Sequence, residues 1–321
     1  MMRQRDFSID ILKFFAALLI TNSHMEPLYG KYSMLASGGA IGDVLFFFCS
    51  GFTLFLGQER RFDNYYKRRI NRIYPTVFMW ALMASVIFHR HSDMLDIVIN
   101  GGGWFVSCIM IYYVILYFVR KYAFCQLRLI FLFFALLSLV WYSLMDKPAN
   151  YNMYGQTYFK WCHYFLFMLL GAIMGSHPIQ RNFSLKWDSL KLIGCILFYY
   201  GILVIGRKWT IVHDIQVVSL LPLLGTTYYF YKVCKTDTLM RLYGTRFVGS
   251  VMKTISGLCL EVYLVQGVLF TDKFNSLFPL NLLFMFVFIL LVAYLLRCMA
   301  RWFSQTFREA DYEWKEIFRL Y

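Results

Sequence analysis

FSIDILKFFAALLITNSHMEPL, residues 7–28, is the first long apolar stretch of the chain, and it carries ionisable side chains toward both ends. Lys13 and His24 are eleven residues apart. On one α-helix they therefore differ by roughly 20° in direction and lie about 16 Å apart in depth. Ionisable groups are costly inside a bilayer and usually mark a pathway or a reaction site. One helix face thus carries a cation, Lys13, near the first end of the stretch and a proton acceptor, His24, near the second end.

The composition is that of a polytopic membrane protein. Of 321 residues, 60% are hydrophobic and 16% charged, and the mean hydropathy is +0.54. A soluble protein of this length needs a smaller apolar share for its core. Cutting at charge clusters, prolines and glycines predicts an all-α fold with about ten transmembrane helices. The predicted spans are 7–28, 40–57, 72–89, 104–120, 128–145, 159–176, 190–206, 214–231, 251–271 and 279–300.

The distribution of Lys and Arg orients these helices. With a cytoplasmic N-terminus, the inner segments hold 24 of these residues, among them Arg3, Arg5, Arg181 and the basic residues from Arg297 onward, and the outer loops hold seven. Such a split follows the positive-inside rule. We expect both termini in the cytoplasm and His24 toward the outside. The basic charge is then mainly topogenic, and no nucleic-acid partner is expected.

One membrane domain and a short tail are expected. Residues 1–300 form the membrane domain, and residues 301–321 mix aromatic and charged side chains, which is typical of an amphipathic tail on the inner leaflet. The first stretch is too long for a signal peptide and contains Lys13, so an uncleaved helix is expected. The eight cysteines show no paired spacing, and therefore neither a disulfide framework nor a metal site is indicated.

Five motifs in the right order resemble acyltransferase family 3, and the resemblance extends to about residue 270. The motifs are Asp10-Ile-Leu-Lys13 followed by His24, Leu45-Phe-Phe-Phe-Cys-Ser50-Gly51-Phe52, Arg69-Ile-Asn-Arg72-Ile-Tyr-Pro75, Trp104-Phe105, and Glu261-Val-Tyr263-Leu264-Val-Gln266. The resemblance implies a membrane domain that takes an acyl group, most often acetyl, from cytoplasmic acyl-coenzyme A. It further implies delivery to a hydroxyl of a glycan or related acceptor, commonly at the outer face.

Two positions depart from the pattern of the family. Lys13 stands where the family usually has Arg, and Gln266 where it often has His. Lys keeps the charge but loses the bidentate fork, and Gln cannot titrate. These departures put the catalytic weight on His24, and they also leave open a catalytically silent acyl-binding relative.

Acyl transfer to a hydroxyl needs a base, and His24 is the histidine that the first helix places in the membrane near its outer side. The alternative is a packing histidine bonded to a neighbour. Glu26 could orient the imidazole from an unwound turn, although residues two apart do not share a helix face. Asp43 is an equal candidate for this role. Supporting hydrogen bonds are expected from Asn22 and Ser50, and close helix packing is the alternative role of Ser50-Gly51.

The donor is expected to bind on the inner side. Asp10 and Lys13 can pair across one helical turn as a structural ion pair, or Lys13 can line the mouth of a channel for the pantetheine arm. Arg69 and Arg72 share one face. Their guanidinium groups suit the phosphates of coenzyme A, and a purely topogenic role is the alternative.

Three more positions complete the predicted site. Trp104 opens the fourth span behind three glycines, which either form an adaptable outer loop at the acceptor side or simply start the helix. Gln266 is a supporting residue. Glu261 lies within the ninth span and must have a partner if it is ionised. The Gly171 and Gly175 pair is predicted to serve helix packing.

Rival functions remain at this stage. A secondary transporter or a glycan flippase also suits about ten helices with buried charges, but inverted repeats, frequent in transporters, are not evident. Capsule, O-antigen, exopolysaccharide and lipid-linked sugars are all compatible acceptors. Membrane lipids are expected partners, and the oligomeric state is left open. The resemblance is closest to bacterial members and favours the bacterial inner membrane.

Overall fold

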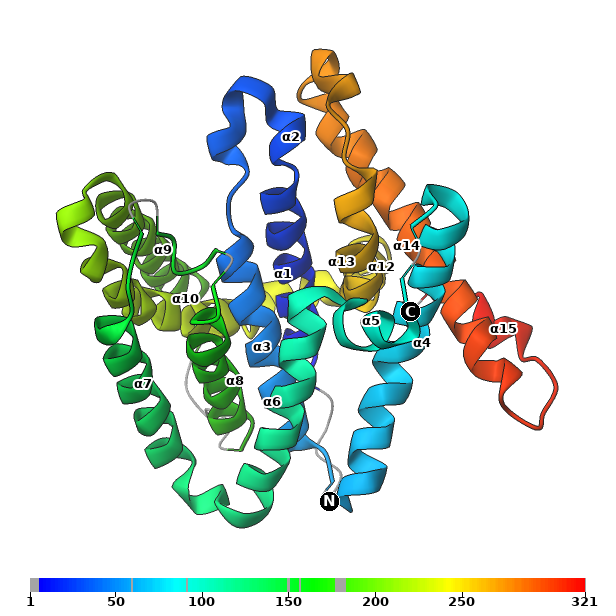
Figure 1. The fold of residues 1–321 in the computed structure, drawn as a ribbon, viewed down its shortest axis with the longest axis horizontal. Coiled ribbons are helices and arrows are strands. Elements are labelled where there is room, and N and C mark those ends of the chain that lie inside the picture. Colours follow the sequence, from blue (N-terminus) through cyan, green and yellow to red (C-terminus); the bar gives the residue numbers. More distant parts are fainter. Residues whose placement is uncertain are drawn as a thin grey trace. The chain divides into compact units, whose positions relative to one another are not determined.

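The computed structural model describes residues 6–58, 60–90, 92–148, 151–155, 157–176 and 183–320, and within them all regular structure is helical, as predicted (Figure 1). The chain forms two compact units that alternate along the sequence. Unit 1 comprises residues 1–16, 40–58 and 116–249, and unit 2 comprises residues 17–39, 59–115 and 250–321. Arg3, Arg5 and Arg181, which entered the predicted orientation, lie outside the described residues.

The helices are divided between the units as follows. Three helices run well across a boundary between units, namely α1 (Ser8–His24), α6 (Gly103–Tyr122) and α12 (Arg246–Gly257), and the first residue of α3, Gly39, also belongs to unit 2. Unit 1 further holds α3 (Gly39–Leu56), η2 (Phe124–Gln126), α7 (Leu127–Leu144), α8 (Lys160–Ser176), α9 (Leu185–Lys208), η3 (Thr210–Ser219), α10 (Leu220–Cys234) and α11 (Asp237–Gly244). Unit 2 further holds α2 (Glu26–Tyr29), η1 (Gly30–Leu35), α4 (Phe62–Phe88), α5 (Met94–Asn100), α13 (Cys259–Leu269), η4 (Asp272–Leu277), α14 (Leu280–Thr306) and α15 (Trp314–Ile317).

Several of the described helices are long and apolar enough to cross a membrane. By length and hydropathy there are six, or seven if α12 and α13 form one span that is bent by 73°. The remaining predicted spans coincide with α1 and α8, of 17 residues each, and with α10, of 15. These helices indicate an integral membrane protein, whereas the total of about ten spans and the orientation of the termini stay predictions.

Helix α4 begins earlier than its predicted span. It starts at Phe62 instead of residue 72, because the basic segment before the apolar run is itself helical. Arg61 precedes it in an extended conformation, and Asp63 in the first turn complements the positive end of the helix dipole. Arg69 and Arg72 therefore lie on the body of α4 and are held by its backbone.

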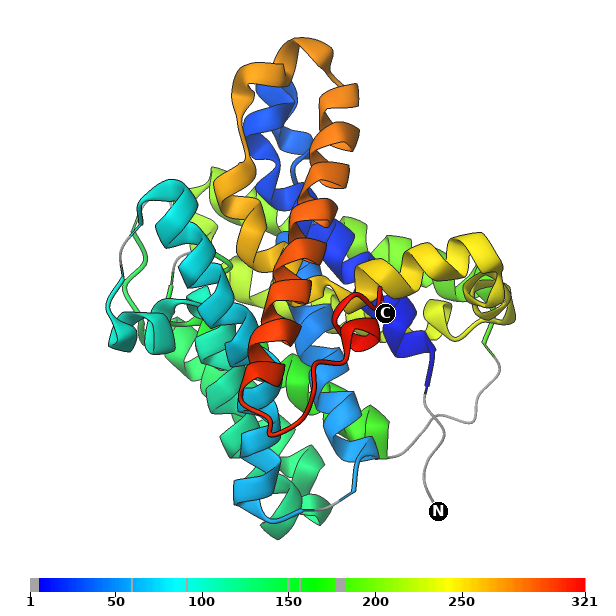
Figure 2. The same cartoon turned by 90° about the vertical axis from the view of Figure 1, so that its right-hand side faces the viewer.

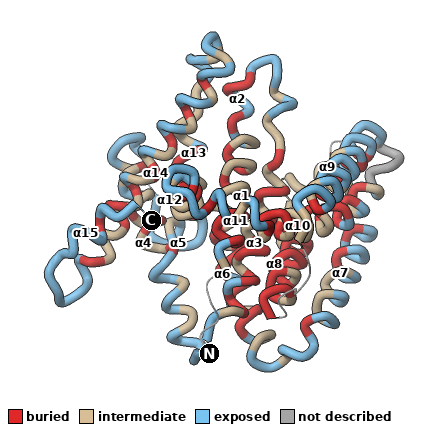
Figure 3. The backbone as a smooth tube through the Cα atoms, turned by 180° about the vertical axis from the view of Figure 1, so that it is seen from behind, coloured by how far each residue is buried: buried red, intermediate tan, exposed pale blue. Residues whose placement is uncertain are grey.

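The core of unit 1 depends on close packing between α3 and α8, both of which are largely buried (Figure 3). A Cβ atom added at Gly171 would collide with the backbone of Phe48, and one added at Gly175 with the backbone of Phe52. From the opposite side, Gly51 meets the backbone of Met168 in the same way. The predicted packing role of Gly171 and Gly175 is confirmed.

The segment after α14 turns back along that helix (Figure 2). The Tyr294 hydroxyl donates to the carbonyl oxygen of Phe318 at 2.8 Å, and Arg301 donates to that of Ile317 at 3.3 Å. Ile317 is 2% exposed. The tail is thus attached to α14 by its backbone carbonyls, while its predicted place on the inner leaflet, and the domain boundary at residue 300, stay predictions.

Replacing Gly171 with Ala is expected to destabilise unit 1 by about 1–3 kcal/mol, because the added methyl group forces two helix backbones apart. The change is measured as the free energy of unfolding in detergent. Gly194 on α9 is the matched control, since a Cβ there meets no atom within 4 Å. An equal loss in Gly171→Ala and Gly194→Ala would contradict the packing role.

Candidate functional site

His24 is the last residue of α1, and its side chain is exposed. Met25 separates it from α2, whose first turn contains Pro27. Within the described chain the imidazole makes no hydrogen bond and no ion pair, whether with Glu26 or with any other residue. His24 is therefore an exposed imidazole at a helix end, and its role as a base stays a prediction. The orienting role predicted for Glu26 stays a prediction.

Asn22 fixes the loop that follows His24. Its side-chain amide donates to the carbonyl oxygens of Leu35 and Ser37, at 2.9 Å each, and its oxygen accepts from the Tyr29 hydroxyl at 2.5 Å. Burial raises the pKa of Tyr29, so this phenol keeps its proton and donates. The loop is thereby closed onto the end of α1. A direct contact of Asn22 with substrate stays a prediction.

Two further asparagines of unit 2 hold the same loop. Asn281 at the start of α14 donates to the carbonyl oxygen of Leu28 at 2.8 Å, and Asn275 in η4 donates to that of Pro27 at 2.8 Å. Asn281 is 2% exposed. The backbone beside His24 is therefore anchored to α14, and the position of the imidazole does not depend on a flexible loop.

Arg69 lies between two aromatic rings. Its guanidinium carbon is 5.3 Å from the ring centre of Tyr65 and 5.1 Å from that of Tyr113, and the Tyr65 hydroxyl donates to the Tyr113 carbonyl at 3.1 Å. Within the described chain Arg69 has no acidic partner. Cation–π contacts of this kind orient the guanidinium group and leave its donors for an anion. Arg72, one turn later, is exposed.

Glu261 has the partner that the sequence required. Arg297 of α14 forms a fork to it, with Nε to Oε1 and Nη2 to Oε2 both at 3.2 Å. Both side chains are largely buried. Sequence reasoning missed Arg297 because it counted the residue as a topogenic charge. Its place within the predicted span 279–300 was the signal that it also needed a partner.

The start of α6 meets α13. Gly103 has φ +63°, a conformation that favours glycine, and a Cβ there would lie 2.8 Å from the Tyr263 hydroxyl. Next to it, Trp104 is half-buried, and Phe105 packs on the Tyr263 ring at 5.7 Å. Gln266 is 2% exposed, and its Oε1 has no hydrogen-bond partner in the described chain.

Four predicted site residues lie in unit 1. Asp10 accepts from the Tyr243 hydroxyl at 3.0 Å, and Lys13 is half-buried on α1. Asp43 accepts from the Tyr164 hydroxyl at 3.4 Å. Ser50 lies beside Gly51, at the close contact of α3 with α8. Pairing of Asp10 with Lys13, and cooperation of Asp43 or Ser50 with His24, stay predictions.

The described residues contain no group of three or more His, Cys, Asp or Glu side chains that could hold a metal ion. The ionisable groups instead lie singly or in pairs. Such an arrangement suits proton transfer and binding of anions.

The comparison with protein families settles the class of protein. The model of acyltransferase family 3, described as an acyltransferase domain, matches residues 6–298. The chain belongs to acyltransferase family 3. Its membership supports acyl transfer in general. Comparisons of this family 3 acyltransferase with curated proteins and with solved structures gave no match.

Replacing Asn281 with Ala in this acyltransferase is expected to cost about 1–3 kcal/mol of stability, because the buried carbonyl of Leu28 loses its donor. Thermal unfolding in detergent measures the change. Asn275→Ala removes an equally short bond from a more exposed position and should cost less. If Asn275→Ala proved the more damaging of the two, burial of the Leu28 carbonyl could not be the cause.

Proposed function

We propose that this protein transfers an acyl group, in the first instance acetyl, from cytoplasmic acyl-coenzyme A to a hydroxyl of a cell-surface or lipid-linked glycan. The observation that carries the proposal is the family match over residues 6–298. The proposal includes about ten spans, both termini in the cytoplasm and a bacterial inner membrane, as the positive-inside count favours.

His24 is the proposed general base. Its imidazole ends a helix, has no hydrogen-bond partner in the described chain, and stands beside a loop anchored by three asparagines. In the reaction it takes the proton of the acceptor hydroxyl, whose oxygen forms the new bond to the thioester carbonyl carbon. The carbon–sulfur bond breaks, and the sulfur receives that proton. The products are an ester and the free thiol of coenzyme A.

Arg69, Arg72 and Lys13 are proposed to bind the donor. Two tyrosine rings orient Arg69, which has no acidic partner in the described chain. A guanidinium group with free donors suits phosphate oxygens. Arg72 is exposed one turn away on the same helix. Lys13 binds by charge alone, since it lacks the fork.

The remaining predicted residues are proposed to support the reacting groups. Trp104 and Gln266 belong to α6 and α13, which meet at Gly103. A buried amide oxygen without a partner is costly unless a ligand or water satisfies it, and this supports Gln266 as an acceptor for a donor group of the substrate. The other proposed supporting residues are Asp10, Asn22, Glu26, Asp43, Ser50 and Glu261.

One observation favours a transporter or flippase as the second candidate. The 73° bend between α12 and α13 resembles the broken helices at transporter binding sites. Family membership weighs against it, because that match supports acyl transfer. An acyltransferase moves a labelled acyl group from the thioester of acyl-coenzyme A to an ester. A transporter, a flippase or a silent acyl-binding relative does not.

Replacing His24 with Asn is expected to abolish transfer of radiolabelled acetyl from acetyl-coenzyme A to membrane glycans, because Asn cannot accept the proton. Vesicles from cells with and without the gene provide the assay, and mass spectrometry of the glycans identifies the acceptor. His89→Asn is the matched control. His89 also ends a helix and is exposed, and Asn tolerates its φ of 52°.

Both variants should insert and express like the unchanged protein. Transfer at the normal rate in His24→Asn would remove the base assignment. Absence of transfer in the unchanged protein, across acyl donors and glycan extracts, would favour the transporter or the silent relative.

Replacing Arg69 with Lys is expected to raise the KM for acyl-coenzyme A by about tenfold, the equivalent of about 1.4 kcal/mol, because the bidentate fork is lost. The kcat should change less. Arg68→Lys is the control, since its exposed side chain is assigned to the interface. If the KM of Arg69→Lys stayed at the value of Arg68→Lys and of the unchanged protein, Arg69 would be excluded from donor binding.

A further inference from the structure

The interruption between α12 and α13 is the least regular feature of unit 2. The two helices meet at Leu258, which is 1% exposed, and their axes differ by 73°. A helix that ends leaves its last carbonyl groups without partners. Within a membrane such groups must be satisfied by protein, because no water is at hand. Local donors meet part of this need, because the Leu258 N–H donates to the carbonyl oxygens of Thr254 and Ile255 and the Cys259 thiol donates to that of Ser256. The carbonyl of Gly257 takes its donor from another helix.

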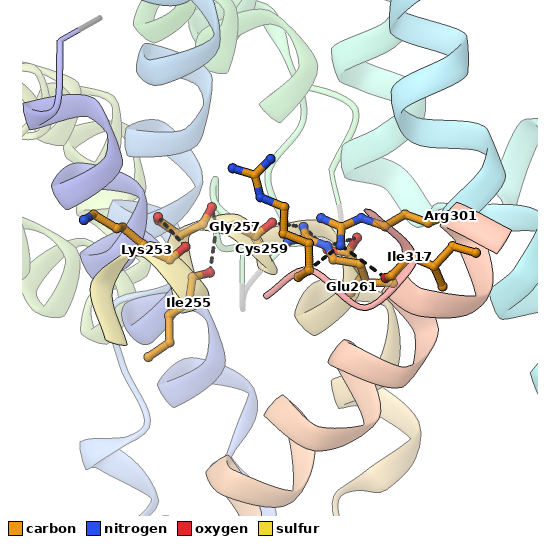
Figure 4. A network of polar contacts seen from close by, with 10 residues as sticks. Lys253, Ile255, Gly257, Cys259, Glu261, Arg301 and Ile317 are labelled. Carbon is orange, nitrogen blue, oxygen red and sulfur yellow. Dashed lines mark hydrogen bonds and ion pairs between the residues drawn. The ribbon is translucent and has the colours of Figure 1, made fainter. Parts of the chain in front are cut away.

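Arg297 supplies that donor. Besides its fork to Glu261, its Nη2 donates to the carbonyl oxygen of Gly257, the last residue of α12. Figure 4 shows Gly257 and Glu261 on the two sides of the break. One guanidinium group thus bonds both helices at once, which its several donors allow and an ammonium group does not.

The charges also match the two helix ends. Glu261 lies in the first turn of α13, where a negative charge is favourable, and Arg297 lies against the end of α12, where a positive charge is favourable. Because the pair is largely buried, removing either partner leaves an uncompensated charge. The contact therefore stabilises the ends of both helices at the break.

Arg301, one turn after Arg297 on α14, has a different task. It donates to the carbonyl oxygens of Glu316 and Ile317, at 3.0 and 3.3 Å, and holds the C-terminal tail (Figure 4). It has the same charge on the same helix and makes no hydrogen bond to the break. The chain thus offers a matched control for Arg297.

The angle of α13 determines where its site residues lie. Tyr263 packs against Gly103 and Phe105 at the start of α6, and Gln266 follows one turn later with its buried oxygen. The helix also packs against α4, which carries Arg69. A change of the bend moves Tyr263 and Gln266 relative to α4 and α6, and leaves α4 itself unchanged.

We propose that Arg297 is a positioning residue, which locks the break between α12 and α13 so that α13 holds Tyr263 and Gln266 in place for acyl transfer. The inference rests on the proposed function. It does not require Arg297 to touch a substrate. It predicts that loss of the Arg297 fork slows the chemical step, while donor binding by Arg69, Arg72 and Lys13 is unchanged.

Arg297→Lys and Glu261→Gln test the proposal, with Arg301→Lys as the control. Spin labels on p-acetylphenylalanine at positions 251 and 267 report the distance across the break without labelling the native cysteines. Val251 on α12 is 40% exposed, and a side chain added at Gly267 on α13 meets no atom within 4 Å. Acyl transfer is measured as kcat per acetyl-coenzyme A binding site, so that misfolded protein does not count.

Both test variants should broaden or shift the distance distribution, and kcat per binding site should fall about 10- to 100-fold, as small misplacements of reacting groups do. The KM for acetyl-coenzyme A should stay within about twofold, because Arg69 and Arg72 are untouched. Arg301→Lys should leave all three readouts unchanged.

An unchanged distance distribution in Arg297→Lys and Glu261→Gln would contradict the claim that Arg297 holds the break between α12 and α13. A changed distribution with an unchanged kcat per site overturns the positioning role. If the unchanged protein transfers no acyl group, the proposed function fails, while the distance measurement still decides whether Arg297 holds the break.

Discussion

Polar groups inside apolar helices need protein partners, and this requirement governs the arrangement of unit 2. Arg297 meets it for the broken helix by bonding both Gly257 and Glu261. Asn281 meets it for the loop after His24 by bonding the carbonyl of Leu28. The same helix, α14, supplies both side chains. The loop beside the proposed base and the helix with the supporting residues are therefore fixed by one scaffold.

The sequence predicted the helices well, because apolar length and charge clusters determine where a chain can cross a membrane. Each predicted segment overlaps a described helix, although the eighth is shared by η3 and α10 and the ninth by α12 and α13. Gly171 and Gly175 pack as expected. The beginning of α4 at Phe62 was missed, since a charged segment can be helical without being apolar. The bend at Leu258 was also missed, although Ser256 and Gly257 directly precede it and such a pair is a common site of helix kinks.

The candidate site could be predicted only as separate residues. The need of Glu261 for a partner followed from its depth, but the partner lies on another helix, and sequence spacing does not reveal such contacts. Tyr65 and Tyr113 around Arg69 were hidden for the same reason. The tertiary partners of Asn22 were hidden too, and they reveal a structural use of that side chain. Hydropathy indicates how deep a residue lies in the membrane, whereas its side-chain partner on another helix becomes known only from the folded structure.

The central claim is that an acyl group enters on the inner side and leaves as an ester on the outer side, with His24 taking the proton. Sealed inside-out vesicles given labelled acetyl-coenzyme A and a membrane-impermeant esterase test it most directly. The account predicts a labelled ester that the esterase removes only after detergent opens the vesicles. Label that is removed from intact vesicles, or label that stays on the thioester, would contradict it.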